Sequence, residues 1–124
     1  MCTAITYQTK DHYFGRNLDL EYTYNTAVTV TPRNYPLHFR KMGTIHSHYA
    51  LIGMATVVDD YPLYFEATNE KGLSMAGLNF PGIATYYAED PGKDNVTPFE
   101  LIPWLLAQCD TVAQAKKLLN KLNL

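Results

Sequence analysis

The side chain with the clearest chemical potential in this sequence is the cysteine at its second position. Cys2 directly follows the initiator Met1, and a residue as small as Cys permits removal of that methionine. Removal would leave one residue with both a thiol and a free α-amine, whose ordinary pKa values are about 8.5 and about 7.7–8.0. An amine beside a thiol can activate the nucleophile without help from a histidine. The start of the chain therefore suggests an N-terminal nucleophile.

Two charged residues, Arg16 and Asp19, are expected to lie beside this thiol. The β-branched and aromatic residues on both sides of Lys10 predict two strands joined by a tight turn. In such a hairpin Cys2 lies opposite a residue between Asn17 and Asp19. A cation lowers the pKa of a neighbouring thiol, and a carboxylate could hold the α-amine. Because Arg16 and Asp19 point to opposite faces of an ideal strand, their convergence requires a bend.

These residues also have ordinary structural interpretations. A lone cysteine is more often a small buried hydrophobe than a nucleophile. Arg and Asp three positions apart usually form a pair on the surface. The residue types alone therefore leave both interpretations open.

Four motifs occur in collinear order along the chain. They are Met1-Cys2-Thr3, Gly15-Arg16-Asn17-Leu18-Asp19-Leu20-Glu21-Tyr22, Asn69-Glu70-Lys71-Gly72-Leu73 and Ala76-Gly77-Leu78-Asn79-Phe80-Pro81. Together they resemble the choloylglycine hydrolase family of N-terminal nucleophile hydrolases, which contains bile salt hydrolases and penicillin V acylases. The resemblance implies that Cys2 is nucleophile and general base, that Arg16 and Asp19 support it, and that Asn79 donates to the oxyanion. Members similar to penicillin acylases tend to carry Tyr at that last position, so Asn79 favours the bile salt branch.

The reaction implied by the resemblance is hydrolysis of the amide that joins a bile acid to glycine or taurine, in a bacterial enzyme without metal or cofactor. A steroid requires an apolar cleft with few polar groups. Candidates for its lining, chosen by proximity to the motifs, are Leu18, Leu20, Tyr24, Phe65 and Ile83. Two alternatives stay open: a penicillin V or N-acyl homoserine lactone acylase of the same family, and a non-catalytic fragment or binding module.

Length is the main departure from the family pattern. Family members are much longer, and a second asparagine and a second arginine of their site lie beyond Leu124. Residues 1–124 are therefore identified as one apparently truncated N-terminal nucleophile hydrolase domain, the N-terminal part of the enzyme, which alone is not expected to be fully competent. Its expected partners are the substrate and either a second copy of the chain or the remainder of the same polypeptide.

Composition indicates a globular protein in a reducing compartment. The 124 residues are 47% hydrophobic and 18% charged, as in folded domains. A formal net charge of −2 gives no reason to expect a nucleic acid or an anionic membrane as partner. Cys2 and Cys109 are too few for a disulfide framework. No leader precedes Cys2 and no apolar run approaches a membrane span, so the expected location is cytoplasmic.

The middle of the chain predicts a sheet. Residues 27–31 and the apolar run 49–58 are typical of strands, and a second hairpin is expected where 64–68 and 73–79 flank Asn69-Glu70-Lys71-Gly72. The paired Asp59-Asp60 is expected to be a solvated turn. Residues 32–48, rich in Pro, Gly, His and basic residues, predict a loop or an irregular edge, and in this segment His46 and His48 form an exposed polar pair without a third metal ligand.

The C-terminal part changes to a helical period. Thr97-Pro98-Phe99-Glu100 is a capping-box pattern, and Pro103 predicts a kink or an early 3₁₀ turn in the helix that follows. Thr111 begins a second helix with an apolar stripe, formed by Val112, Ala115, Leu118, Leu119 and Leu122. Cys109 is on the stripe of the first helix and is expected to be inert. Strands followed by helices predict an α+β fold, for which the resemblance implies the four-layer αββα sandwich.

Overall fold

The computed structural model describes residues 2–124, and its centre is an antiparallel sheet with strand order β3-β6-β7-β8. The four strands are β3 (Ala27–Thr31), β6 (Leu51–Val58), β7 (Tyr61–Asn69) and β8 (Ser74–Ala76). Asp59 and Asp60 join β6 to β7 as an exposed two-residue turn with positive φ angles of 48° and 61°, typical of a tight hairpin. The strand at 27–31, the Asp-Asp turn and the hairpin over 69–72 are as predicted.

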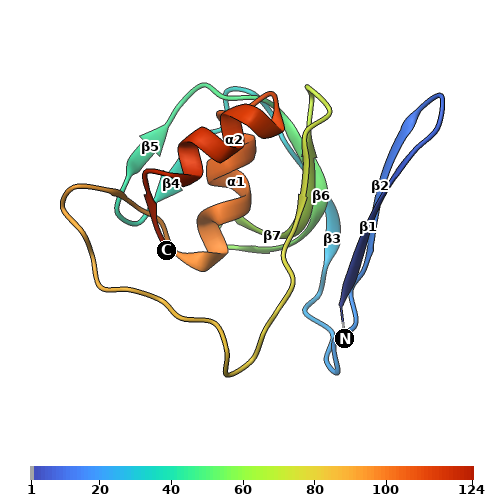
Figure 1. Cartoon of the computed structure of the whole chain (residues 1–124), viewed down its shortest axis with the longest axis horizontal. Helices are drawn as coiled ribbons and strands as arrows, with labels where there is room; N and C mark the ends of the chain where they lie inside the picture. The colour runs from blue at the N-terminus through green and yellow to red at the C-terminus, as the bar shows by residue number, and fades with distance from the viewer. Residues whose placement is uncertain (1) are drawn as a thin grey trace.

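Two helices cover one face of this sheet (Figure 1). A 3₁₀ turn, Pro98–Glu100, leads into α1 (Leu101–Leu106), and α2 covers Val112–Leu119. The predicted capping box is present, because the Glu100 carboxylate accepts from the Thr97 N–H at 3.1 Å and from its hydroxyl at 2.8 Å. One side of α1 packs on the sheet in a core of Leu51, Ala55, Tyr64, Ala67, Ile102 and Leu106. Full burial of one leucine stabilises the fold by roughly 1.5–3 kcal/mol.

Residues 32–48, predicted as a loop or an irregular edge, are more regular than expected. This segment contains a short hairpin, β4 (Leu37–Phe39) and β5 (Gly43–Ile45). Leu37 and Phe39 alternate with an exposed histidine, so both apolar side chains point inward, where the Phe39 ring meets the edge of Trp104 with centroids 5.0 Å apart. The alternation of apolar and polar residues covers only three positions. It is too short to be recognised as a strand in a segment that also contains prolines and a glycine.

The predicted exposed histidine pair was wrong for one of its members. His46 is exposed, but His48 is buried and its ring hydrogen-bonds to the carbonyl oxygens of Tyr35 at 2.8 Å and Tyr49 at 2.7 Å. The imidazole thereby ties the approach to β4 to the start of β6. Among residues 2–124, no three His, Cys, Asp or Glu side chains gather as metal ligands.

The second helix is shorter than its apolar stripe predicted. It begins as expected, with the Thr111 hydroxyl accepting from the Gln114 N–H at 3.3 Å, but Leu122 lies in β10 (Leu122–Asn123), parallel to β9 (Asp94–Asn95). The stripe fails because Val112 and Leu119 are exposed. Of its helical members, Leu118 alone packs against the second core, which is formed by Leu37, Phe39, Val96, Trp104 and Ala107. Neither helix in the described part of the chain is long and apolar enough to cross a membrane.

The remaining element is a hairpin of β1 (Thr3–Gln8) and β2 (His12–Asn17), with its turn centred on Lys10 as predicted. It lies on the side of the sheet opposite the helices (Figure 1). Arg16 joins the two layers through Glu66 of β7 and the carbonyl of Gly77. The order of layers is therefore helices, sheet, hairpin, and the chain combines strands and helices in an α+β arrangement.

Candidate active site

Cys2 lies at the open end of the β1–β2 hairpin. Thr3 pairs with Asn17, so the next step of the register sets Cys2 opposite Leu18, within the range predicted. The half-buried thiol lies 3.8 Å from the backbone oxygen of Asp19, to which it can donate. The Thr3 N–H donates to Asn17 Oδ1 at 2.6 Å, and this bond holds the peptide that follows Cys2. In the sequence analysis Asn17 was one end of the range expected opposite Cys2, and it was assigned no such role.

Arg16 shares a face of the hairpin with Cys2. It pairs directly with Ala4, and residues two apart on a strand point to the same side, so Cys2 and Arg16 are diagonal cross-strand neighbours, which usually lie about 7–8 Å apart. The Arg16 side chain is only 5% exposed. It donates through Nη1 to Glu66 Oε2 and through Nη2 to the Gly77 carbonyl, both at 2.9 Å. The sequence predicted the position of this cation but not its anchors.

Glu66 is the site residue that sequence reasoning missed. It follows a β-bulge, because Tyr64 pairs with Ala55 and Glu66 with Met54, which leaves Phe65 without a partner in β6. Glu66 Oε1 accepts from the Met54 N–H at 3.2 Å while Oε2 accepts from Arg16. A single charged residue within an otherwise uncharged strand was the available signal, since a buried charge requires a partner.

Asp19 and Asn79 lie just outside the strands that carry the site. The chain leaves strand conformation after Asn17, and the Asp19 carbonyl adjoins the thiol. Strand β8 ends at Ala76, so Asn79 lies in an exposed loop and not at the end of a strand that reaches residue 79. Its segment is tied to the hairpin two residues earlier, where Arg16 binds the Gly77 carbonyl.

The apolar candidates fall into two groups. The rings of Tyr24 and Phe65 contact each other with centroids 5.9 Å apart, and Leu18 and Leu20 are half-buried just after β2. The structure does not bring Ile83 to them, because it is 76% exposed in a turn closed on the carbonyl of Phe80.

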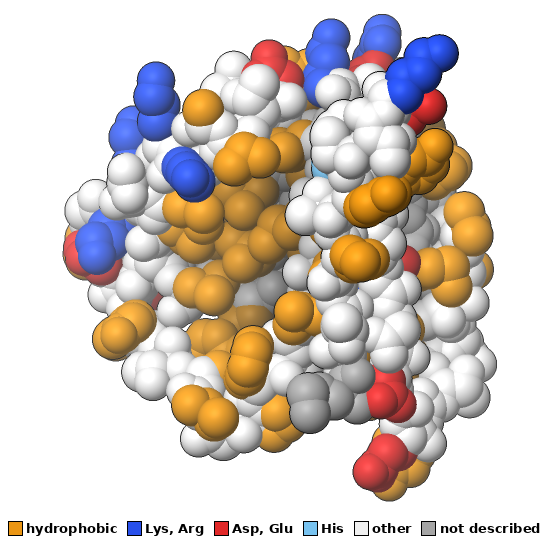
Figure 2. All heavy atoms as spheres, turned by 45° about the vertical axis from the view of Figure 1, so that its right-hand side comes forward, with side chains coloured by type: hydrophobic (Ala, Val, Ile, Leu, Met, Phe, Trp, Pro, Cys, Tyr) orange, Lys and Arg blue, Asp and Glu red, His pale blue; other side chains and the backbone are white. Residues whose placement is uncertain are grey.

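The surface around these residues is rich in exposed hydrophobic side chains. Val28, Val30 and Ile52 lie on the sheet face that also carries Glu66, and the loop after β8 adds Leu78, Phe80 and Ile83. Figure 2 shows hydrophobic side chains gathered in a hollow on this side of the molecule. Such a surface suits an apolar ligand or the packing of more polypeptide.

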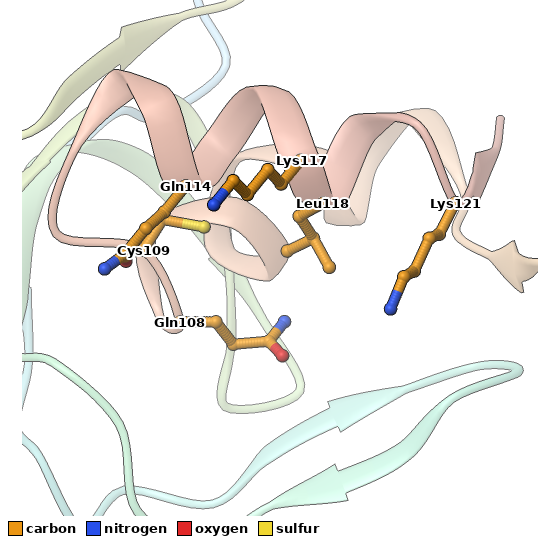
Figure 3. Close-up of a pocket in the computed structure, with 6 residues that line it drawn as sticks. All are labelled: Gln108, Cys109, Gln114, Lys117, Leu118 and Lys121. Carbon is orange, nitrogen blue, oxygen red and sulfur yellow. The ribbon is translucent and has the colours of Figure 1, made fainter.

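A second hollow, of about 290 Å³, lies on the helical side (Figure 3). Its lining is Gln108, Cys109, Gln114, Lys117, Leu118 and Lys121. Cys109 is only 3% exposed, and burial raises the pKa of its thiol. No residue of the candidate site borders this hollow, so it is separate from the chemistry proposed for Cys2.

Comparison with known proteins finds one family match and several similar sequences. The profile of linear amide C–N hydrolases, choloylglycine hydrolase family, matches residues 2–124. A bile salt hydrolase/transferase of Lactiplantibacillus plantarum is 59% identical over 124 residues, which are 100% of this chain and 38% of the relative. One from Clostridium perfringens is 40% identical over 128 residues, covering 100% of this chain and 39% of its own length.

Solved structures agree with these relatives. The crystal structure of the C2A mutant of conjugated bile acid hydrolase from Clostridium perfringens matches 99% of this chain and 39% of its own, with a TM-score of 0.90 and 39% identity. This likeness confirms the predicted fold class, with the chain as a part of the N-terminal nucleophile hydrolase sandwich. The chain spans about two fifths of the length of the relatives it matches.

Proposed function

The chain belongs to the choloylglycine hydrolase family of linear amide C–N hydrolases, and on that basis we propose that the protein hydrolyses the amide bond of glycine- or taurine-conjugated bile acids. The relatives named above are bile salt or conjugated bile acid hydrolases. The observation that carries the proposal is the placement of Cys2 and Arg16 on one face of the hairpin, toward the sheet. Asn79 follows closely on the segment that Arg16 binds.

In the proposed reaction, removal of Met1 frees the α-amine of Cys2. The amine takes the thiol proton, and Sγ attacks the amide carbonyl carbon to form a tetrahedral oxyanion. Asn79 and backbone N–H groups donate to that oxyanion, which is the usual means of stabilising it. The carbon–nitrogen bond then breaks, and the protonated amine passes its proton to the departing glycine or taurine nitrogen. Water attacks the resulting thioester, which releases the bile acid and restores the thiol.

The neighbouring residues have supporting roles in this proposal. Arg16 supplies a cation on the face of the hairpin that carries the thiol, and Asp19 orients the α-amine. The Tyr24–Phe65 ring pair, with Leu18 and Leu20, contributes apolar surface for the steroid. A cleft of this kind excludes water from the reacting carbonyl, which strengthens each hydrogen bond made there.

The proposal is tested by measuring release of glycine and taurine from glycocholate and taurocholate by the full-length protein. Cys2→Ala is expected to abolish release, and the matched control Cys109→Ala to retain it. The mass of the active protein should lack Met1. Release that survives Cys2→Ala would contradict the mechanism. Preferential cleavage of penicillin V or of an N-acyl homoserine lactone would keep the mechanism and replace the substrate class.

We also propose that the protein acts in the cytoplasm and associates with further copies of itself. Both cysteines are free, as expected for a reducing compartment. The exposed hydrophobic side chains on the hairpin side supply surface for association. Cell fractionation tests the first point and light scattering of the purified protein the second, and a periplasmic or monomeric protein would contradict them.

A further inference from the structure

The Arg16 guanidinium is held by hydrogen bonds to elements outside its own hairpin. Two of its three nitrogens are fixed by the central sheet and the loop after it, through Glu66 and the Gly77 carbonyl. The third, Nε, is buried and has no hydrogen-bond partner within residues 2–124. A buried donor without a partner destabilises the folded state. The guanidinium is therefore fixed in orientation by its two Nη atoms, and its buried Nε–H makes no hydrogen bond in the described part of the chain.

Glu66 orients Arg16, and its own carboxylate is held in place by hydrogen bonds. Each of its carboxylate oxygens has a different donor: Oε1 accepts from the Met54 backbone and Oε2 from Arg16. The bulge at Phe65 sets the direction of the side chain. An ideal Cβ at Gly53 would lie 2.0 Å from the Glu66 carbonyl oxygen, so the close approach of β6 to the bulge requires glycine there. The carboxylate is thus positioned by backbone geometry, not by a free rotamer.

A simpler interpretation is that the pair only fastens the hairpin to the sheet. Any buried arginine requires a counterion, and the side chains of Arg16 and Glu66 are 5% and 18% exposed. Two observations favour a role in the reaction: Arg16 is the diagonal neighbour of Cys2 on the same face, and the pairing leaves its Nε–H unused.

We propose that Glu66 is a positioning residue for the reaction, which holds the Arg16 guanidinium on the face of the hairpin that carries the Cys2 thiol. The inference rests on the proposed function, because it requires Cys2 to be the nucleophile. Removing the carboxylate releases Arg16 and withdraws its cation from the thiolate. A misplacement of about 1 Å at such a site can lower the rate by about 10²-fold.

The chain offers a matched control. Glu70 also accepts from a backbone N–H, that of Ala50 at 3.0 Å, and pairs with an arginine, Arg33. That ion pair is exposed and lies at the β7–β8 turn, away from the hairpin. Glu66→Gln and Glu70→Gln therefore each remove one carboxylate–guanidinium pair and alter one backbone hydrogen bond, but only the first acts on Arg16.

The experiment compares these two variants in the full-length protein. The measurements are the rate of Cys2 alkylation by iodoacetamide from pH 5 to 10, kcat and KM for glycocholate, and the melting temperature. For Glu66→Gln we expect the midpoint of alkylation to move to higher pH and kcat to fall by up to about 10²-fold with KM little changed. Glu70→Gln should keep the wild-type alkylation midpoint and kcat. Glu66→Asp, which retains the charge, should have a midpoint and a kcat between those of Glu66→Gln and the wild type.

Two results would overturn the proposal. One is a lower melting temperature for Glu66→Gln with the alkylation profile and kcat of the wild type, which would make the pair a fastener alone. The other is a midpoint moved to lower pH with kcat retained, since removal of a negative charge beside a stationary Arg16 would do this. If Glu66→Gln does not fold, Glu66→Asp, whose shorter side chain withdraws the carboxylate from Arg16, should show the same changes to a smaller degree, and wild-type alkylation and kcat in that variant would overturn the proposal. Alkylation reports on Glu66 even if bile salts prove not to be the substrate.

Discussion

At the scale of single residues, Arg16 and Asn69 show how few side chains connect the parts of this chain. Arg16 joins the hairpin to β7 and to the loop after β8. Asn69 donates through Nδ2 to the carbonyls of Leu106 and Cys109 and accepts at Oδ1 from the Lys71 and Leu73 N–H groups. All the hydrogen-bonding capacity of this buried amide is used. Each of these two residues therefore fixes the relative position of elements that are not paired in one sheet.

Asn79 belongs to the same scale, as the proposed donor to the oxyanion. Asn79→Ala is expected to lower kcat by about 10²–10³-fold, the usual cost of losing one such donor. Because the side chain is exposed and lies outside the strands, stability and KM should change little. Steady-state kinetics and a melting curve measure both. An unchanged rate would show that the residue has no part in the transition state.

The two thiols should differ strongly in reactivity. Burial, with a smaller contribution from Asp110, raises the pKa of Cys109, so this thiol stays protonated until higher pH. Cys2 is half-buried at the open end of the hairpin. Iodoacetamide is therefore expected to label Cys2 much faster at pH 8, and labelling of Cys109 should keep rising at more alkaline pH. Peptide mass spectrometry of the folded protein measures both rates, and equal rates would contradict an activated Cys2.

At the scale of elements, the bulge in β7 decides where the site residues point. One extra residue, Phe65, turns the strand so that its own ring meets Tyr24 and the next side chain meets Arg16. Bulges often redirect side chains in this way next to active sites. The run Tyr64-Phe65-Glu66 indicates a strand, but its pattern contains no mark of the insertion. For that reason sequence reasoning predicted the strand and missed Glu66.

Gly53 tests the importance of this bulge. Gly53→Ala would place a Cβ 2.0 Å from the Glu66 carbonyl oxygen, so the two strands must separate. Overpacking of this kind typically costs about 1–3 kcal/mol, and we expect a loss at the upper end because backbone atoms must move. The control is Gly15→Ala in β2, where the nearest atom would be at 3.9 Å. Urea unfolding of both variants measures the difference, and equal stabilities would contradict the close approach.

At the scale of the whole molecule, much of the architecture could be predicted from short-range patterns. The first hairpin, strands β3 and β6, the capping box before α1 and the Thr111 cap of α2 follow from residue alternation and turn or cap signals over a few positions. The β4–β5 hairpin and the β9–β10 pairing could not be predicted in this way. Both depend on contacts between segments distant in sequence, such as Phe39 with Trp104 and Leu122 with Asp94.

The exposed sheet face has a consequence for the 124-residue polypeptide produced by itself. Val28 and Val30 are 70% and 61% exposed, and they continue the face that carries Glu66. We expect this polypeptide to bind the dye ANS and to self-associate, because contiguous apolar surface favours association. Replacing both residues by threonine keeps the β-branched shape and should reduce both effects. A monomer without ANS fluorescence would contradict the expectation.

The long separation between Arg16 and its anchors matters while the chain is being synthesised. The hairpin leaves the ribosome first, but Glu66 and Gly77 are 50 and 61 residues further along. At about 5–20 residues per second, the hairpin waits roughly 3–12 seconds for the second of them. A two-stranded hairpin alone is at best marginally stable in water. During this interval the nascent thiol should therefore have ordinary reactivity, and stalled chains that expose residue 60 but not residue 80 should show no enhanced alkylation of Cys2.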